Sequence, residues 1–157
     1  MKQAPRIWAC AAALLAAWPA FADMPVLTIT GMVEESSVAL TLEELRDLPQ
    51  HQLTTSTTVT DGTPVFEGFL MRDLLDEVQA QGDTVIAHAL NDYRMEIPVS
   101  DFVDFDVMGA LSMDGMPLNP RDKGPVWIVY PRDDHRELQD IRFDTRWVWQ
   151  LVSLHVQ

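Results

Sequence analysis

The sequence predicts an α+β fold: a single domain built on a mixed, barrel-like β-sheet with short helices. Three observations support this prediction. Many short segments alternate apolar and polar residues or are rich in β-branched and aromatic residues, which is typical of strands. The helical segments between them are short and lack the regular strand–helix–strand order of a parallel sheet. The chain has 157 residues, enough for one domain with a core but too few for two.

The segment 1–22 is predicted to be a secretory signal peptide rather than part of this domain. Lys2 and Arg6 give a positively charged start, the run IWACAAALLAAW is apolar but too short to span a bilayer, and AFA is a small-x-small cleavage site. An uncleaved membrane anchor is the alternative. Cleavage would leave residues 23–157 as a periplasmic domain that is not inserted into the membrane.

The charge of the chain excludes two classes of partner. Its formal net charge is −13, and such a surface repels nucleic acid and anionic lipid. Solubility is the default explanation of this acidity, and a basic protein partner is the alternative. The single cysteine, Cys10, lies within the leader, so the mature domain is expected to contain neither a free thiol nor a disulfide.

The first elements follow from local patterns. VLTITG, residues 26–31, alternates like a strand and ends at glycine. ALTLEELRDLP begins a helix, in which Thr41 is the N-cap, Glu44 completes a capping box and Pro49 ends the helix. The buried stripe of this helix is predicted to contain Leu42, Leu45 and Leu48.

A second helix and a hairpin are expected next. GFLMRDLLDEVQAQG, residues 68–82, has leucine and valine at helical spacing and ends at Gly82. DTVIAHA is a strand, and NDYRMEIP continues it as a hairpin whose turn is Asn91-Asp92. Ser100 is predicted to cap a short turn around DFVDF.

The second half of the chain is predicted to be mostly β-structure. DFVDFDV, residues 101–107, lacks the glycine and closing glutamate of a calcium loop, so a solvated acidic turn is favoured. VMGALSMDGMPL reads as two strands joined by a type I′ turn at Asp114-Gly115. GPVWIVYP is a further strand. RWVWQLVSLHV, residues 146–156, is expected to be one long strand.

Motifs for several chemistries are missing from the sequence. It contains no P-loop, no dinucleotide fingerprint and no nucleophile elbow. The four histidines lack the spacing of zinc ligands, so surface or singly hydrogen-bonded histidines are the favoured interpretation. These histidines are His51, His88, His135 and His155.

Aromatic and polar residues gather late in the sequence. Trp127 and Tyr130 flank one predicted strand, and Arg146 and Trp149 lie in another together with Trp147. Such side chains cover the faces of flat heterocycles and hydrogen-bond their edges. The plainer interpretation is that these aromatic rings fill the core.

The order of these pieces resembles the molybdopterin-binding domain of the sulfite oxidase family. LTLEELRDLP, FEGFLMRDLLDEV, NDYRMEIPVSDF and ALSMDGMPLNPRDKGPVWIVYP follow one another in that order, and a closing β-segment follows them. The resemblance covers residues 27–156 and implies the fold of that domain. It also implies that LTTSTTVTDG, residues 53–62, is a strand and a turn that line the pterin site.

Two departures from the family set this chain apart. In the catalytic members, a cysteine thiolate in the segment matching residues 53–62 binds molybdenum, and this segment contains no cysteine. Many catalytic relatives also have a basic residue before the final strand that helps to bind the cofactor phosphate, whereas the corresponding position here is Trp149. The resemblance therefore implies a pterin as ligand, molybdopterin-like or free, without molybdenum.

A non-catalytic role follows from these departures. Short exported proteins with a similar V-W-Q-L segment include pterin-responsive regulators that dock on the periplasmic domain of a membrane sensor that makes or degrades cyclic di-GMP. The same role is expected here. The expected pterin site comprises stacking residues Trp149 with Trp127 or Tyr130, Asp61 as acceptor for ring amino and N–H groups, Arg146 for a carbonyl oxygen or phosphate, and Asn91 and Tyr93 at the rim.

Two alternatives to the pterin-binding regulator stay open at this point. The first is a molybdopterin-dependent oxidoreductase whose metal takes an oxygen ligand from Thr57, Thr58 or Asp61. The second is an interaction protein with a vestigial pocket, for which the acidic surface would suit a basic partner.

Overall fold

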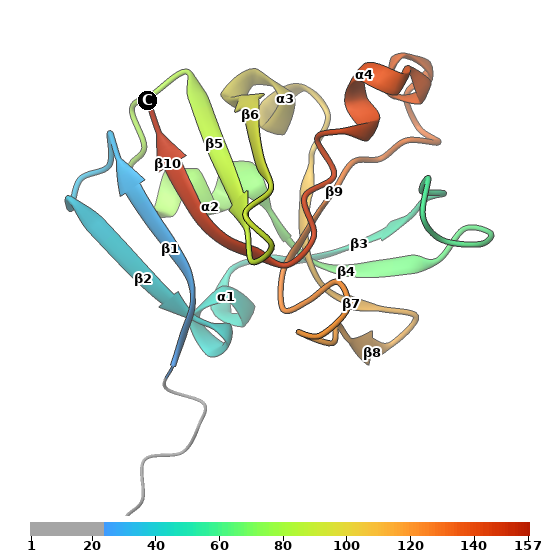
Figure 1. Ribbon diagram of the computed structural model, residues 1–157, viewed down its shortest axis with the longest axis horizontal. Coiled ribbons are helices and arrows are strands. Elements are labelled where there is room, and N and C mark those ends of the chain that lie inside the picture. The colour runs from blue at the N-terminus through green and yellow to red at the C-terminus, as the bar shows by residue number, and fades with distance from the viewer. Residues whose placement is uncertain (1–23) are drawn as a thin grey trace, which may run out of the picture.

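The computed structural model describes residues 24–157, and the predicted signal peptide lies outside this range. The strands form two sheets (Figure 1). The first sheet has the order β2 (Ser37–Thr41), β1 (Pro25–Gly31), β10 (Leu151–Val156), β5 (Thr84–Ala89) and β6 (Arg94–Pro98). The second has the order β3 (Gln50–Thr54), β4 (Val65–Leu70), β7 (Met108–Met113) and β8 (Met116–Pro117), and β9 (Trp127–Val129) also pairs with β7.

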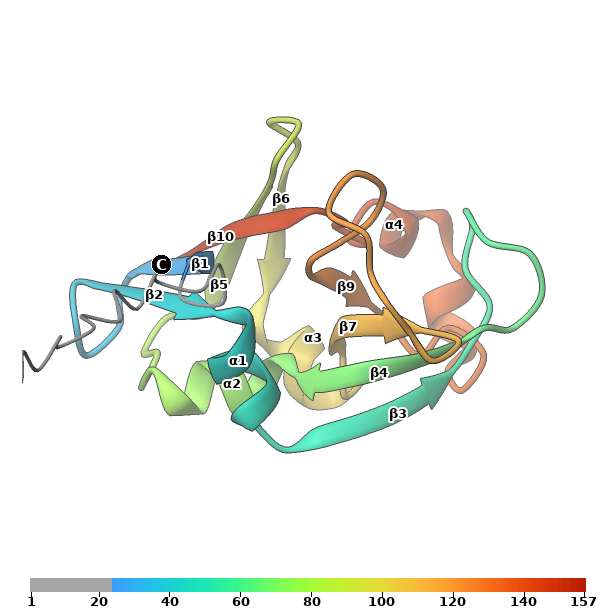
Figure 2. The same cartoon turned by 90° about the horizontal axis from the view of Figure 1, so that it is seen from below.

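The predicted α+β class is confirmed, but the arrangement of the strands differs from the single barrel-like sheet that was expected. They form two open sheets instead of one closed barrel, and Figure 2 shows the sheets as separate layers. The first sheet is mixed because β10 pairs in parallel with β1, with Thr28 opposite Ser153, and antiparallel with β5. The last strand therefore lies in the middle of this sheet.

Short helices connect the two sheets. They are α1 (Leu42–Asp47), α2 (Met71–Glu77), α3 (Val99–Asp104) and α4 (Ile141–Asp144), and a 3₁₀ turn, η2 (Arg136–Gln139), precedes α4. Helix α1 contacts β2 of the first sheet and β4 of the second, and α2 contacts β4 and α3. In residues 24–157, no helix has both the length and the apolar character needed to span a membrane.

The predicted N-terminal cap of α1 is confirmed. The Glu44 backbone N–H donates to Thr41 Oγ1 at 3.2 Å, and Glu44 Oε2 accepts from the Thr41 backbone N–H at 2.7 Å. These bonds satisfy two N–H groups at the helix start, where the helix itself offers no acceptor. Hydrogen bonding from Thr41 also lowers the pKa of Glu44. Leu45 is fully buried, while Leu42 and Leu48 are half-buried.

Replacement of this cap gives a first testable prediction. Thr41→Ala removes the side-chain acceptor, so we expect the free energy of unfolding to fall by about 1 kcal/mol in a urea titration. Thr63→Ala is the matched control, because the Thr63 side chain is exposed and makes no hydrogen bond within residues 24–157. Equal stability of the two variants would contradict the role of the capping box.

Both predicted hairpin turns are confirmed. Asp92 has a φ of 66° between β5 and β6, and Asp114 and Gly115 have φ values of 51° and 76° between β7 and β8. Positive φ at both Asp114 and Gly115 is the signature of a type I′ turn, which matches the twist of the paired strands, whereas the β5–β6 turn has positive φ at Asp92 and not at Asn91. The tip of the β5–β6 hairpin projects away from the rest of the domain in Figure 2.

The second predicted helix begins later than expected, because residues 68–70 continue strand β4. The helix starts at Met71. Gly68 explains the difference, since a Cβ atom there would lie 2.1 Å from the carbonyl oxygen of Gly109 on β7. The glycine therefore allows β4 and β7 to approach closely, and the apolar residues after it serve the sheet rather than a helix.

The predicted long strand at residues 146–156 is also shorter in the structure. Only Leu151–Val156 forms β10, because Gln150 adopts a left-handed backbone conformation with a φ of 50°. The Gln150 backbone N–H donates to the carbonyl oxygen of Lys123 at 2.9 Å, and its side-chain amide donates to that of Pro120 at 2.8 Å. These two bonds hold the chain in a bend that separates Trp149 from the strand.

The prediction for Ser100 was wrong. Helix α3 begins at Val99, and its N-cap is Pro98, which has no side-chain hydrogen bond to offer. Ser100 therefore lies inside the helix. Of the three acidic residues that follow, Asp101 is buried, whereas Asp104 and Asp106 are exposed.

Candidate functional site

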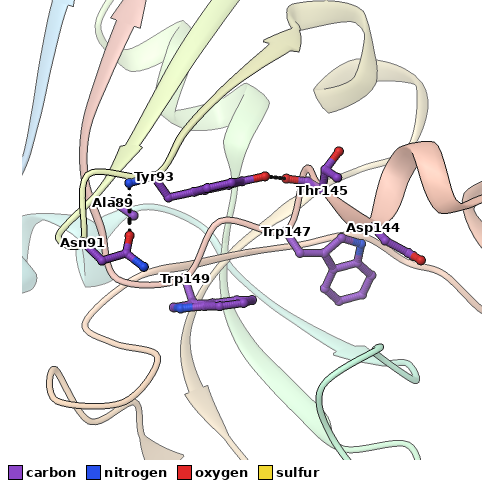
Figure 3. Close-up of a pocket in the computed structure, with 7 residues that line it drawn as sticks. All are labelled: Ala89, Asn91, Tyr93, Asp144, Thr145, Trp147 and Trp149. Atoms are coloured by element: carbon purple, nitrogen blue, oxygen red, sulfur yellow. Dashed lines mark hydrogen bonds between the residues drawn. The ribbon is translucent and has the colours of Figure 1, made fainter.

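An apolar pocket lies between the β5–β6 hairpin and the segment 144–149, which connects α4 to β10 (Figure 3). Its volume is about 280 Å³. The hairpin turn and the bend at Gln150 bring these two segments together, and the Leu90 backbone N–H donates to the Gln150 carbonyl oxygen at 2.9 Å. The pocket is lined by Ala89, Asn91, Tyr93, Asp144, Thr145, Trp147 and Trp149.

Aromatic rings form most of the wall. In Figure 3 the rings of Tyr93 and Trp149 are both seen edge-on, one above and one below the space between them. Trp147 closes a third side. Two aromatic faces that oppose each other across a gap suit a planar ligand, because each face can stack on one side of it.

Tyr93 is held in this position by its own hydrogen bonds. Its hydroxyl donates to the carbonyl oxygen of Thr145 at 2.7 Å, and its backbone N–H donates to Asn91 Oδ1 at 3.1 Å. Partial burial raises the pKa of the Tyr93 phenol. The first bond connects the hairpin to the opposite side of the pocket, so Tyr93 serves as a wall.

Trp147 is supported from behind by the core. Its ring lies 6.3 Å from that of Trp127 and 6.2 Å from that of Tyr130, centroid to centroid. Trp127 and Tyr130 have no exposed surface, and neither lines the pocket. The two residues were predicted to stack on the ligand, but in the structure they support the wall from behind.

A buried polar network fixes the segment that carries Trp147. Asp101, on α3, accepts a hydrogen bond from the Tyr130 hydroxyl at 2.9 Å and another from the Arg146 guanidinium. The guanidinium also lies 4.7 Å from the centre of the Phe143 ring. Burial, together with the neighbouring Asp101 carboxylate, raises the pKa of Tyr130.

The network contradicts the predictions made for Asp101 and Arg146. Asp101 is 7% exposed, so at this residue the predicted solvated acidic turn is wrong. Arg146 neutralises the Asp101 carboxylate instead of lining the pocket. A buried carboxylate is stable only when a cation or several donors compensate it, which accounts for this pairing.

The expectation that residues 53–62 form a strand and a turn lining the site was wrong: this hydroxyl-rich stretch is mainly a loop, and none of its residues lines the pocket. Strand β3 ends at Thr54, and residues 55–64 are irregular. Asp133 anchors this loop, since its carboxylate accepts from the Ser56 backbone N–H and from the Ser56 hydroxyl, both at 2.6 Å. Asp61 is exposed on the same loop and does not line the pocket.

The anchor gives a second prediction, on pH. Hydrogen bonds from Ser56 lower the pKa of Asp133 below its ordinary value of about 3.9. The resulting stabilisation of the loop is complete above that ordinary value and is lost as the pH falls through the lowered one. Ser56→Ala should raise the pKa of Asp133 in an NMR titration, and Thr58→Ala, on the exposed part of the loop, should leave it unchanged. Equal values in both variants would contradict the anchor.

The structure thus brings together three of the predicted site residues: Asn91, Tyr93 and Trp149. It adds Trp147, Asp144, Thr145 and Ala89, which were not predicted as site residues. Trp147 carried a signal, because it is an aromatic residue close to Trp149 in the sequence. Asp144 and Thr145 carried none, since nothing in the sequence marks the end of α4 as a pocket wall. Within residues 24–157, no group of three or more His, Cys, Asp or Glu side chains is arranged to hold a metal ion.

Comparisons with known proteins agree with the resemblance noted in the sequence. The model of the oxidoreductase molybdopterin binding domain family matches residues 18–133. The solved structure of the sulfane dehydrogenase SoxCD from Paracoccus pantotrophus is similar in fold, with a TM-score of 0.67 and 20% sequence identity. This match covers 90% of the present chain and 40% of the SoxCD chain, so the present chain spans less than half of that protein. A comparison with curated proteins gives no match.

Proposed function

This chain belongs to the oxidoreductase molybdopterin binding domain family, and from that premise we propose that it is a periplasmic, non-catalytic pterin-binding protein. The pterin binds between Tyr93 and Trp149. Its bound or free state is signalled to the periplasmic domain of a membrane enzyme of cyclic di-GMP metabolism.

The observation that carries the proposal is the pair of opposed rings. A pterin is a planar bicycle, and the pocket offers it Tyr93 on one face, Trp149 on the other and Trp147 at the side. None of the described residues that line the pocket is basic, so the terminal phosphate of molybdopterin finds no cationic partner there.

The proposal of a non-catalytic role rests on residues 53–62. A soft thiolate is the ligand that the resemblance places in this segment. The only side-chain ligands that the segment offers a metal are hydroxyl groups and the carboxylate of Asp61. The hydroxyl of Thr57 already shares a hydrogen bond of 2.7 Å with that of Thr60. When bound in catalytic relatives, the metal supplies redox chemistry, and here the protein residues would only bind and orient the organic ring.

The test is to identify what the protein carries. The full chain is produced with its leader, purified from the periplasm, extracted with acid and analysed by fluorescence and mass spectrometry. A pterin at near-stoichiometric amount, with metal analysis showing little molybdenum, is the expected result. Stoichiometric molybdenum would instead favour an oxidoreductase, and native mass spectrometry without any bound heterocycle would favour an interaction protein with an empty pocket.

A further inference from the structure

We propose that Asn91 determines which ring the pocket accepts, by donating a hydrogen bond from its side-chain amide to a carbonyl oxygen on the edge of the ring. This inference rests on the proposed function and extends it. In this contact Asn91 is the donor, so the edge of the ring that faces the hairpin must present a hydrogen-bond acceptor and not an amino group.

The orientation of the Asn91 amide is fixed by the backbone. The Tyr93 backbone N–H needs an acceptor, and it donates to Asn91 Oδ1 at 3.1 Å. The oxygen of the amide is thereby assigned, and its nitrogen must point the other way. Figure 3 shows this nitrogen turned away from the Tyr93 backbone and towards the Trp149 side of the pocket.

Among the other polar groups of the lining, the Asp144 carboxylate accepts hydrogen bonds and does not donate them, and two hydroxyl groups already donate within the protein. The Tyr93 hydroxyl donates to the Thr145 carbonyl oxygen at 2.7 Å, and the Thr145 hydroxyl donates to that of Arg142 at 3.2 Å. The indole nitrogen of Trp147 makes no hydrogen bond within residues 24–157, but it is buried, so the pocket surface does not expose it to a ligand.

The remaining ring donor does not compete with the amide. The indole N–H of Trp149 lies in the plane of its ring, so it cannot point at a ligand stacked on that ring. Among the described lining residues, the Asn91 amide nitrogen is therefore the donor available to the edge of a stacked ring.

A single donor of this kind discriminates by chemistry rather than by size. A 2-amino-4-oxopteridine (pterin) offers a carbonyl oxygen to the amide, and 2,4-diaminopteridine has nearly the same shape but offers an amino group in that place. Two donors that face each other cannot pair, so the diamino ring loses the hydrogen bond that the oxo ring makes with the amide. The oxo ring should therefore bind about tenfold more tightly than the diamino ring, or more.

Asn91→Asp tests the assignment with little change of shape. The aspartate keeps Oδ1 as acceptor for the Tyr93 backbone N–H and replaces the donor by a second acceptor, so the turn is preserved. Asn119→Asp is a matched control. Asn119 Oδ1 accepts from the Arg121 backbone N–H at 2.9 Å in the same i, i+2 arrangement. Asn119 is exposed, as Asn91 is, but it does not line the pocket.

The measurement is fluorescence titration of the full chain, freed of endogenous ligand, with each of the two rings. The wild-type protein and Asn119→Asp should prefer the oxo ring, and Asn91→Asp should reverse the order. The inference is overturned if Asn91→Asp weakens both rings by the same factor or changes neither, or if the wild-type protein prefers the diamino ring. If neither ring binds the wild-type protein, the proposed function itself fails and the inference fails with it.

Discussion

Trp149→Ala should lower the affinity for pterin by about 10- to 100-fold, because it removes one of the two stacking faces. Stacking of a base on an aromatic side chain is worth about 1–3 kcal/mol by alanine substitution. For a wild-type affinity in the micromolar range, on the order of −8 kcal/mol, such a loss is enough for the ligand to dissociate during purification. Pterin should therefore no longer copurify with the variant.

Trp149 is half-buried, and the bend at Gln150 separates it from β10, so the variant is expected to fold. Trp149→Phe is the control, since it keeps a flat face and should retain most of the affinity. Circular dichroism of both variants should match that of the wild-type protein. If pterin still copurified with Trp149→Ala in the same amount, Trp149 would not belong to the site, and binding between Tyr93 and Trp149 would be contradicted.

Asp101→Asn should give the largest loss of stability, about 3 kcal/mol in urea unfolding. The carboxylate compensates the Arg146 guanidinium inside the domain, and removing one partner of a buried ion pair leaves the other uncompensated. Arg146 is 23% exposed, so we place the effect at the low end of the usual range. The Tyr130 hydroxyl also loses a charged acceptor.

Asp104→Asn is the matched control for this variant. Asp104 belongs to the same helix, α3, and is exposed, so its substitution should change the free energy of unfolding by less than about 0.5 kcal/mol. Equal effects of the two substitutions would show that the network contributes nothing. Because Arg146 lies between Thr145 and Trp147, Asp101→Asn should also weaken pterin binding, although Asp101 does not touch the pocket.

Elements with a short-range signal could be predicted from the sequence. The capping box at Thr41 and Glu44 places α1, and the turns at Asp92 and Asp114 place the two hairpins. In each case the signal and the structure that it specifies lie within a few residues of each other. The fold class followed from the succession of such elements.

Elements that depend on distant partners could not be placed in this way. Gly68 looks like the start of a helix until the backbone of Gly109, on the paired strand β7, is known to lie against it. Gln150 looks like a strand residue until the carbonyl groups of Lys123 and Pro120 are known to bind it. Both exceptions arise because tertiary contacts override local preference.

The site shows the same division. Asn91 and Tyr93 could be predicted as rim residues because their hairpin has a local signal. Trp149 could be predicted because it is aromatic and because the family resemblance places it where catalytic relatives bind the cofactor. Trp127 and Tyr130 are chemically equivalent candidates that the structure buries, and a sequence does not separate a pocket ring from a core ring. Asp61 follows the hydroxyl-rich stretch, but its loop is drawn towards Asp133 by Ser56.

The central position of β10 has a consequence for biosynthesis. This strand leaves the ribosome after every other strand in the described chain, yet β1 and β5 both need it as a neighbour. The first sheet therefore cannot be completed before Leu151–Val156 has been made. For the same reason, deletion of Leu151–Val156 would remove the middle of a sheet and not its edge.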